Sequence, residues 1–242
     1  MVEGNDYFDL NSDNEEYILE GKCGDSVDIG RKMKTKLLEK AEKATCKINS
    51  TNITGTGFFC KIPFNNNKNI MKVLFTNNHI LNEESLKIGK IINILYKGEP
   101  KTIEITNDRL VFTDSRDYKI GLDYSCIQIF DSDGIEDFYE IFNDNFSFEN
   151  EILSVNGYEN GEDLSINSIK SGHLKKIKNY KIYHSVDTGK GCSGSPIILT
   201  NRDFKIIGIH RNTIKEKNIN LGSHIKDILN HIYEDIFKGN EN

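Results

Sequence analysis

Several features that mark other classes of protein are missing from this chain of 242 residues. It has no tryptophan, only 3 prolines and no basic surplus, because 31 Lys and Arg face 37 Asp and Glu, a formal net charge of −6. Proteins that bind DNA or RNA usually carry a basic surplus that meets the phosphates. The composition therefore excludes a role dominated by nucleic acid, while the length is ample for a packed core.

Targeting and membrane signals are also missing. Residues 1–20 are acidic and lack the basic start and apolar run of a secretory signal. No stretch approaches the roughly 18 apolar residues that cross a membrane as a helix. The 5 cysteines are odd in number and form no Cys-x-x-Cys pair, so a structural zinc site is not expected. We predict reduced thiols, a cytoplasmic location and no membrane contact.

Short β-branched and aromatic runs recur from Thr45 onward, separated by Asn, Asp and Gly. Many short strands with turn residues between them predict an all-β sandwich or barrel. The acidic, less regular stretch 131–150 divides the runs into two sets, which predicts two β units joined by a linker. The runs are 55–62, 71–76, 90–97, 101–106, 109–113 and 124–130 in the first set, and 151–158, 164–177, 181–186, 195–200 and 204–210 in the second.

The two ends of the chain differ from this pattern. Residues 1–28 are polar, and we expect them to be poorly ordered or loosely draped. Residues 29–44 are rich in helix formers with apolar residues at helical spacing, which predicts an amphipathic helix. A second amphipathic helix is predicted within 222–240, where apolar residues recur every three or four positions and Gly239 stands near the end.

The segment GKGCSGSPIIL (189–199) is the most informative for chemistry. Ser193 stands between glycines, which let the backbone turn sharply and leave room for a substrate. Backbone N–H groups around such a turn can converge on an oxyanion. The β-branched run after Pro196 predicts a strand rather than the helix that follows the nucleophile of α/β hydrolases. The alternative is a glycine-rich hairpin without catalytic function.

A serine nucleophile needs a base, which a histidine oriented by a carboxylate supplies. His79 directly follows an apolar strand, and Asp123 directly precedes another. Asp114 and Asp117 are competitors for the role of Asp123. The order His79, Asp123, Ser193 is the one used by two-barrel β proteases.

Four blocks together resemble a known family. They are GTGFF (55–59), LFTNNHIL (74–81), LDYSCIQI (122–129), and GCSGSP (191–196) with IIGIH (206–210). The chain resembles trypsin-like serine peptidases of the chymotrypsin superfamily, and among them the bacterial-type, glutamyl endopeptidase-like group. The resemblance covers roughly residues 45–236. It implies two six-stranded antiparallel β-barrels packed together.

The resemblance also implies roles for individual residues. Ser193 would be the nucleophile, His79 the general base and then acid, and Asp123 the carboxylate that orients the imidazole. The backbone N–H groups of Gly191 and Ser193 would form the oxyanion hole.

Two departures from the family pattern bear on activation. Ile80 stands where many secreted members have a disulfide cysteine. Cys192 stands where an Asp often binds a newly cleaved N-terminus, and no activation-type N-terminus occurs. We infer an enzyme that is not switched on by the usual zymogen cleavage. Cys192 is itself an alternative nucleophile, although the match places it one position early.

The residues that would line the pocket for the P1 side chain, which precedes the scissile bond, give opposite signals. Asp187 matches the position that receives Lys or Arg in trypsin-like members. Thr188 and His210 match positions that help to bind an acidic P1 residue in glutamyl endopeptidases. The sequence leaves the specificity open.

On this basis the domain organisation is an N-terminal extension (1–44, an acidic tail plus the helix 29–44) followed by a peptidase domain (45–236). The peptidase domain comprises a first barrel at about 45–130, a linker at about 131–150, a second barrel at about 151–222 and a C-terminal helix at 223–237. The function it predicts is a serine endopeptidase that acts on polypeptides without metal or organic cofactor. The alternatives are a catalytically silent binding module and a cysteine-dependent relative. The N-terminal extension could dock on the barrels or bind a protein partner.

Overall fold

In the computed structural model, the second half of the chain closes into a barrel of six antiparallel strands. The hydrogen-bonded order is β14-β13-β10-β11-β12-β15, and pairing of β14 with β15 closes the ring. These strands are β10 (Ile152–Gly157), β11 (Ser168–Lys178), β12 (Lys181–His184), β13 (Pro196–Leu199), β14 (Lys205–Ile214) and β15 (Ile219–His224). The structure describes residues 17–18, 21–50, 53–64, 69–117, 120–142, 151–159 and 168–239.

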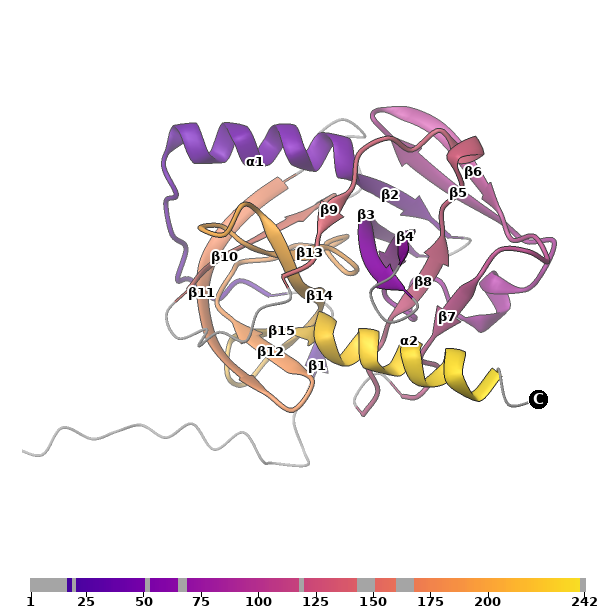
Figure 1. Ribbon diagram of the computed structural model, residues 1–242. Helices are drawn as coiled ribbons and strands as arrows, with labels where there is room; N and C mark the ends of the chain where they lie inside the picture. The colour runs from indigo at the N-terminus through magenta and orange to yellow at the C-terminus, as the bar shows by residue number, and fades with distance from the viewer. Residues whose placement is uncertain are drawn as a thin grey trace, which may run out of the picture.

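The first half of the chain forms a second sheet, in the order β6-β5-β2-β3-β4-β8-β7, with the short β9 parallel to β3. The strands are β2 (Thr45–Asn49), β3 (Thr54–Phe64), β4 (Asn69–Thr76), β5 (Ile91–Tyr96), β6 (Glu99–Glu104), β7 (Val111–Thr113), β8 (Ser125–Gln128) and β9 (Tyr139–Glu140). Figure 1 shows the two units side by side. The predicted two-barrel fold with a helix towards each end is confirmed, and among the described residues the first unit is a half-barrel.

Alternation of side chains explains why these runs form strands. In β5, Ile92 and Ile94 are buried while Ile91 and Asn93 are exposed, as expected for a strand with one face on a core. Each unit has its own apolar cluster. The first includes Ile48, Phe59, Leu74, Ile92, Ile103 and Ile127, and the second includes Leu153, Val155, Leu174, Ile182, Ile197 and Leu199.

A third cluster joins the two units and both helices. Helix α1 (Arg31–Ala44) buries Leu37 and Ala44 in it. Helix α2 (Ile225–Gly239) contributes Ile225, Ile228, Leu229 and Ile232, which pack with Phe58, Phe75 and Tyr124 of the first unit. Helix α2 follows β15 of the second unit directly, and Figure 1 shows it reaching towards the first. No helix in the described part of the chain is long and apolar enough to cross a membrane.

The connection between the units begins with the short 3-10 helix η2 (Asp131–Asp133). It continues through β9 to Phe142, whose N–H donates to the Ile206 carbonyl of β14 at 2.9 Å. The remainder of the predicted linker, 143–150, lies outside the described residues. Another 3-10 helix, η1 (Glu83–Leu86), follows His79 in the first unit.

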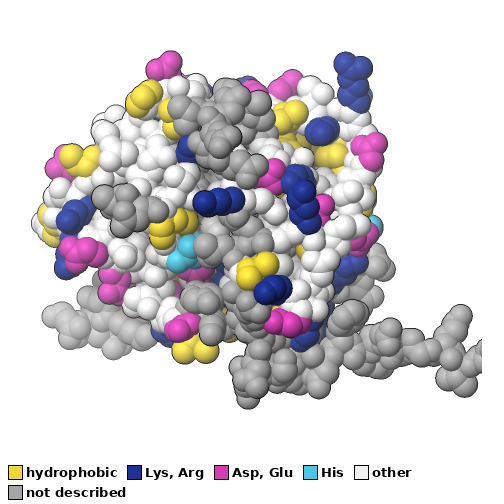
Figure 2. All heavy atoms as spheres, turned by 180° about the vertical axis from the view of Figure 1, so that it is seen from behind, with side chains coloured by type: hydrophobic (Ala, Val, Ile, Leu, Met, Phe, Trp, Pro, Cys, Tyr) yellow, Lys and Arg dark blue, Asp and Glu magenta, His cyan; other side chains and the backbone are white. Residues whose placement is uncertain are grey.

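The surface and the cysteines add two observations. On the face shown in Figure 2, basic and acidic side chains are interspersed, and hydrophobic ones form small separate groups. The described part of this face therefore carries no continuous basic band. All five cysteines lie within the described residues and none forms a disulfide.

Candidate active site

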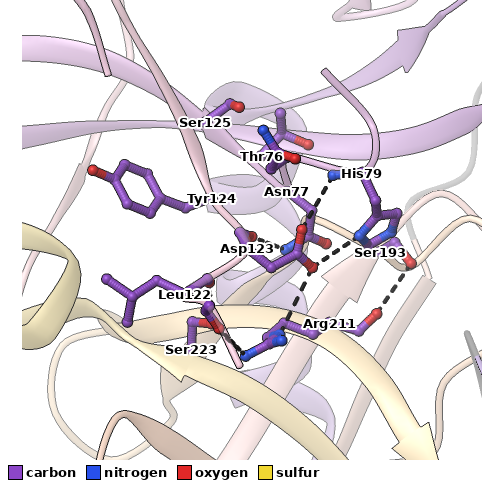
Figure 3. Close-up of polar contacts among 12 residues, drawn as sticks. Thr76, Asn77, His79, Leu122, Asp123, Tyr124, Ser125, Ser193, Arg211 and Ser223 are labelled. Carbon is purple, nitrogen blue, oxygen red and sulfur yellow. Dashed lines mark hydrogen bonds and ion pairs between the residues drawn. The ribbon is translucent and has the colours of Figure 1, made fainter. Parts of the chain in front are cut away.

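His79 and Asp123 meet because the strands that carry them are neighbours. β4 ends at Thr76 and pairs antiparallel with β8, which begins at Ser125 opposite Thr76. His79 follows β4 and Asp123 precedes β8, so both lie at the same edge of the sheet. His79 Nδ1 is 2.8 Å from Asp123 Oδ2, and the His79 backbone N–H donates to Asp123 Oδ1 at 3.1 Å. The carboxylate thus fixes both the ring and the backbone of the histidine (Figure 3).

The backbone around Asp123 is held in an uncommon conformation. Its φ of 47° lies in the left-handed region, which Asp tolerates better than most residues. Asn77 Nδ2 donates to the Asp123 carbonyl at 2.9 Å. The competitor Asp114 supports the same loop, because its Oδ2 accepts the Leu122 N–H at 2.5 Å while its carboxylate also binds Arg116. Asp114 is thus engaged in holding the loop that presents Asp123.

Arg211, on β14, brings a buried cation to this carboxylate. Its Nε lies 3.7 Å from Asp123 Oδ2, and each side chain is only 2% exposed. Arg211 Nη1 also donates to the Gly121 carbonyl at 3.0 Å and to Ser223 Oγ at 3.3 Å. Arg211 of the second barrel therefore fixes the loop of the first unit that carries Asp123. A buried guanidinium needs such partners, since burial of an unpaired charge is costly.

Ser193 lies on the loop that precedes β13, and this loop is held between the two units. The Thr56 N–H of β3 donates to the Ser193 carbonyl at 2.8 Å, and the Gly194 N–H donates to the His210 carbonyl at 3.1 Å. Gly194 has a φ of 86°, and a Cβ there would stand 2.1 Å from the Thr56 carbonyl oxygen. Only glycine fits this approach, which is the reason for the glycine after Ser193.

The predicted oxyanion donors, the N–H groups of Gly191 and Ser193, belong to the turn that carries Ser193. Gly191 has a φ of 100°, and its carbonyl accepts from Thr56 Oγ1 at 2.8 Å. The Cys192 N–H donates to the Gly189 carbonyl at 3.0 Å, which closes the turn. Thr56 therefore fixes this loop through both its backbone and its hydroxyl.

The serine hydroxyl bonds to Arg211 in this structure. Ser193 Oγ donates to the Arg211 carbonyl at 3.2 Å. His79 Nε2 is buried and has no hydrogen-bond partner among the described residues. The polar contacts therefore run from Ser193 through Arg211 to Asp123 and His79 (Figure 3).

The three predicted pocket residues are found in two settings. Asp187 and Thr188 follow β12 and contact the N-terminal segment: Asp187 Oδ1 accepts the Cys23 N–H at 2.5 Å, and the Thr188 N–H donates to the Gly21 carbonyl at 3.1 Å. His210 is fully buried on β14, with its Nδ1 3.4 Å from Nε2 of His184.

The His184–His210 pair is neutral at ordinary pH. Burial lowers the pKa of His184 to about 3. Burial, together with the nearby His184 and His79, lowers the pKa of His210 well below its ordinary value. A second cation at 3.4 Å from the first would be strongly unfavourable.

Three residues of the site, Thr56, Arg211 and Glu159, were not predicted from the sequence. Thr56 stands inside the GTGFF block and Arg211 directly after IIGIH. Arg211 stands within a run of polar residues, 210–213, so its charge gave no distinct signal. Glu159 lies against the nucleophile loop, with its Oε1 4.0 Å from the sulfur of Cys192 and an ion pair to Lys170. The alternative nucleophile Cys192 is thus buried beside a carboxylate.

No protein-family model matches the chain, and no curated protein matches it. Solved structures do. A serine endoprotease from Yersinia pestis matches with a TM-score of 0.63 at 12% identity, over 88% of this chain and 69% of that one. The Rv3671c protease of M. tuberculosis, in an inactive form, matches with a TM-score of 0.61 at 14% identity, over 86% and 96% of the two chains. A human pathogenic astrovirus serine protease gives 0.52 at 17% identity, over 76% and 90%.

At these identities the likeness concerns the fold. The chain has the chymotrypsin-like fold of serine proteases. The narrower resemblance to glutamyl endopeptidases stays a prediction.

Proposed function

We propose that this chain is a serine endopeptidase that hydrolyses peptide bonds through Ser193, His79 and Asp123. The observation that carries the proposal is the 2.8 Å contact between His79 Nδ1 and Asp123 Oδ2. It is made at the edge of the half-barrel, and Arg211 links it to the serine on the glycine-rich loop. Ser, His and Asp act together when the carboxylate holds the imidazole and the imidazole faces the hydroxyl.

The chemistry would begin with the Ser193 hydroxyl turning from the Arg211 carbonyl to His79 Nε2. Such contacts are often loose without substrate and tighten only in the reacting complex. The serine oxygen then attacks the substrate carbonyl while its proton passes to Nε2. Asp123 stabilises the resulting imidazolium through Nδ1. His79 next protonates the leaving amine, and water hydrolyses the acyl-enzyme by the same steps in reverse.

Stabilisation of the tetrahedral intermediate would come from the N–H groups of Gly191 and Ser193. The loop is fixed in place before the reaction, since Thr56 binds the carbonyl groups of both residues. Donors held in advance need no reorganisation as negative charge develops.

The P1 preference is a separate question, because the pocket residues favour opposite side chains. Asp187 favours Lys or Arg, whereas Thr188 and the neutral His210 favour an acidic residue. In the structure, backbone N–H groups of Cys23 and Gly24 already bind Asp187 Oδ1. A peptide library with acidic and basic residues at P1 distinguishes the two preferences.

Labelling by a fluorophosphonate tests the nucleophile. We expect the probe to label the wild-type chain and to fail with Ser193→Ala. Ser195→Ala is the matched control, because Ser195 lies on the same loop and its buried hydroxyl has no hydrogen-bond partner among the described residues. Labelling that persists in Ser193→Ala, or is absent from folded wild type, overturns the proposal. The second outcome would favour a silent binding module.

A further inference from the structure

The described residues that precede α1 contact the second barrel at several points. Their first part, β1 (Tyr17–Ile18), pairs antiparallel with β14. Residues 21–27 then alternate between partly buried odd-numbered and exposed even-numbered positions. The segment ends where the Val27 N–H donates to the Ser171 carbonyl at 2.9 Å. We refer to β1 and residues 21–27 together as the inner segment.

β1 pairs with the part of β14 that lies just beyond Arg211 of the candidate active site. In the register, Ile18 lies opposite Thr213 and Tyr17 opposite Ile214, which stand two and three residues beyond Arg211. The carbonyl of Arg211 accepts the Ser193 hydroxyl. An extended peptide whose carbonyl is to reach Ser193 would add to this same edge, because strand addition satisfies its main-chain groups.

The inner segment then contacts the predicted P1 pocket. The Gly21 carbonyl accepts the Thr188 N–H at 3.1 Å and Asn220 Nδ2 at 3.0 Å. Asp187 Oδ1 accepts the N–H groups of Cys23 at 2.5 Å and Gly24 at 3.0 Å. The Asp187 carboxylate is therefore bound by the chain itself, where a substrate side chain would otherwise reach it.

Gly21 is required for this close fit. A Cβ at Gly21 would stand 2.6 Å from Thr213 Cγ2 and 3.0 Å from Thr213 Oγ1. A distance this short requires either the Thr213 side chain or the inner segment to shift. A side chain at this position would thus loosen the inner segment from β14. The neighbouring Lys22 is exposed and leaves room for change.

We propose that the inner segment is an intramolecular occupant of the peptide-binding edge of β14 and of the P1 pocket, and that it must leave before a polypeptide substrate can bind. This inference rests on the proposed peptidase function. In this proposal the partner of the N-terminal extension is a surface of the same chain, the surface that an extended peptide substrate would use. The competing interpretation is that the segment completes the pocket and is needed for cleavage.

Gly21→Val in the full chain separates the two interpretations, with Lys22→Val as the matched control and Gly21→Ala as a milder second variant. Two rates are measured: labelling of Ser193 by a small fluorophosphonate, which needs no strand pairing, and cleavage of a mixed peptide library. We expect Gly21→Val to cleave peptides about tenfold faster than wild type, because a clash of this kind shifts the segment towards its displaced state. Labelling should change less than cleavage, and Lys22→Val should resemble wild type.

A synthetic peptide of residues 17–27 provides an independent test. Added to Gly21→Val, or to Gly21→Ala should the valine variant not fold, it should restore inhibition, while a scrambled peptide should not. Equal or slower cleavage by folded Gly21 variants overturns the proposal. Loss of fluorophosphonate labelling in wild type would instead count against the peptidase function, so the two failures are distinguishable.

Discussion

The buried pair of His184 and His210 makes the stability of the fold depend on pH. Burial lowers the pKa of folded His184 from its ordinary 6.5 to about 3. The unfolded chain therefore binds the proton more readily than the folded chain. The stabilisation is complete above the unfolded-state pKa of 6.5 and is lost progressively as the pH falls from there towards 3.

The size of the effect follows from the same values. At pH 5 an unfolded histidine is almost fully protonated, while folded His184 is still neutral. The free energy of unfolding should then be lower than at pH 7 by about 2 kcal/mol from this one group. His210 adds an effect of the same sign, because its pKa is also lowered. A second protonation at 3.4 Å from the first would be opposed by the first charge.

Urea unfolding at pH 7 and at pH 5 measures this difference. We expect His184→Gln, which carries no titratable group, to lose about 2 kcal/mol of the pH dependence of the wild type. His173→Gln is the matched control, because His173 lies on the neighbouring strand β11 and is only partly buried. An equal pH dependence in the wild type and His184→Gln would refute the reasoning.

Three substitutions test the site itself. Asp123→Asn should lower turnover by about ten-thousandfold, because the amide no longer holds the working tautomer of His79; steady-state peptide cleavage by the folded variant measures it, and a loss below tenfold would contradict the role. Gly194→Ala should destabilise the fold by at least about 1–3 kcal/mol in thermal unfolding, since its Cβ would meet the Thr56 carbonyl at 2.1 Å; an unchanged melting temperature would contradict it. Arg211→Met should lower the free energy of unfolding by about 3–5 kcal/mol because Asp123 loses a buried cation; a neutral effect in urea unfolding would show that the pair contributes little.

The strands were predictable because their burial repeats with the period of two that a half-exposed sheet imposes. Ile92 and Ile94 of β5 illustrate this, and the helical spacing of Ile225, Ile228 and Ile232 likewise predicted a helix. Closure of the second unit into a barrel could not be predicted in the same way. The closing pair β14–β15 depends on hydrogen bonds between backbones, which the local pattern of side chains does not encode.

The candidate site was predictable as far as chemistry is carried by residue type. The combination of histidine, aspartate and serine has few functions in proteins. The positions of His79, Asp123 and Ser193 next to strand ends were visible in the sequence. The orientation of the Ser193 hydroxyl was not, because it depends on a carbonyl of Arg211 that any residue could supply. Arg211 itself was not predictable, because it stands among polar residues in the second half of its strand.

The inner segment is where the structure differs most from the expectation drawn from the sequence. Polar, glycine-containing residues without periodicity predict loose packing, yet Gly21, Cys23 and Gly24 are bound to Thr188 and Asp187 through their main-chain groups. Every residue except proline offers the same main-chain N–H and carbonyl groups. The residue types therefore do not predict which main-chain groups will form such hydrogen bonds. Only the absence of a side chain at Gly21 is specific, since any other residue would meet Thr213. In a segment of this kind, a glycine marks a close approach, and its substitution is therefore the sharpest probe of what the segment covers.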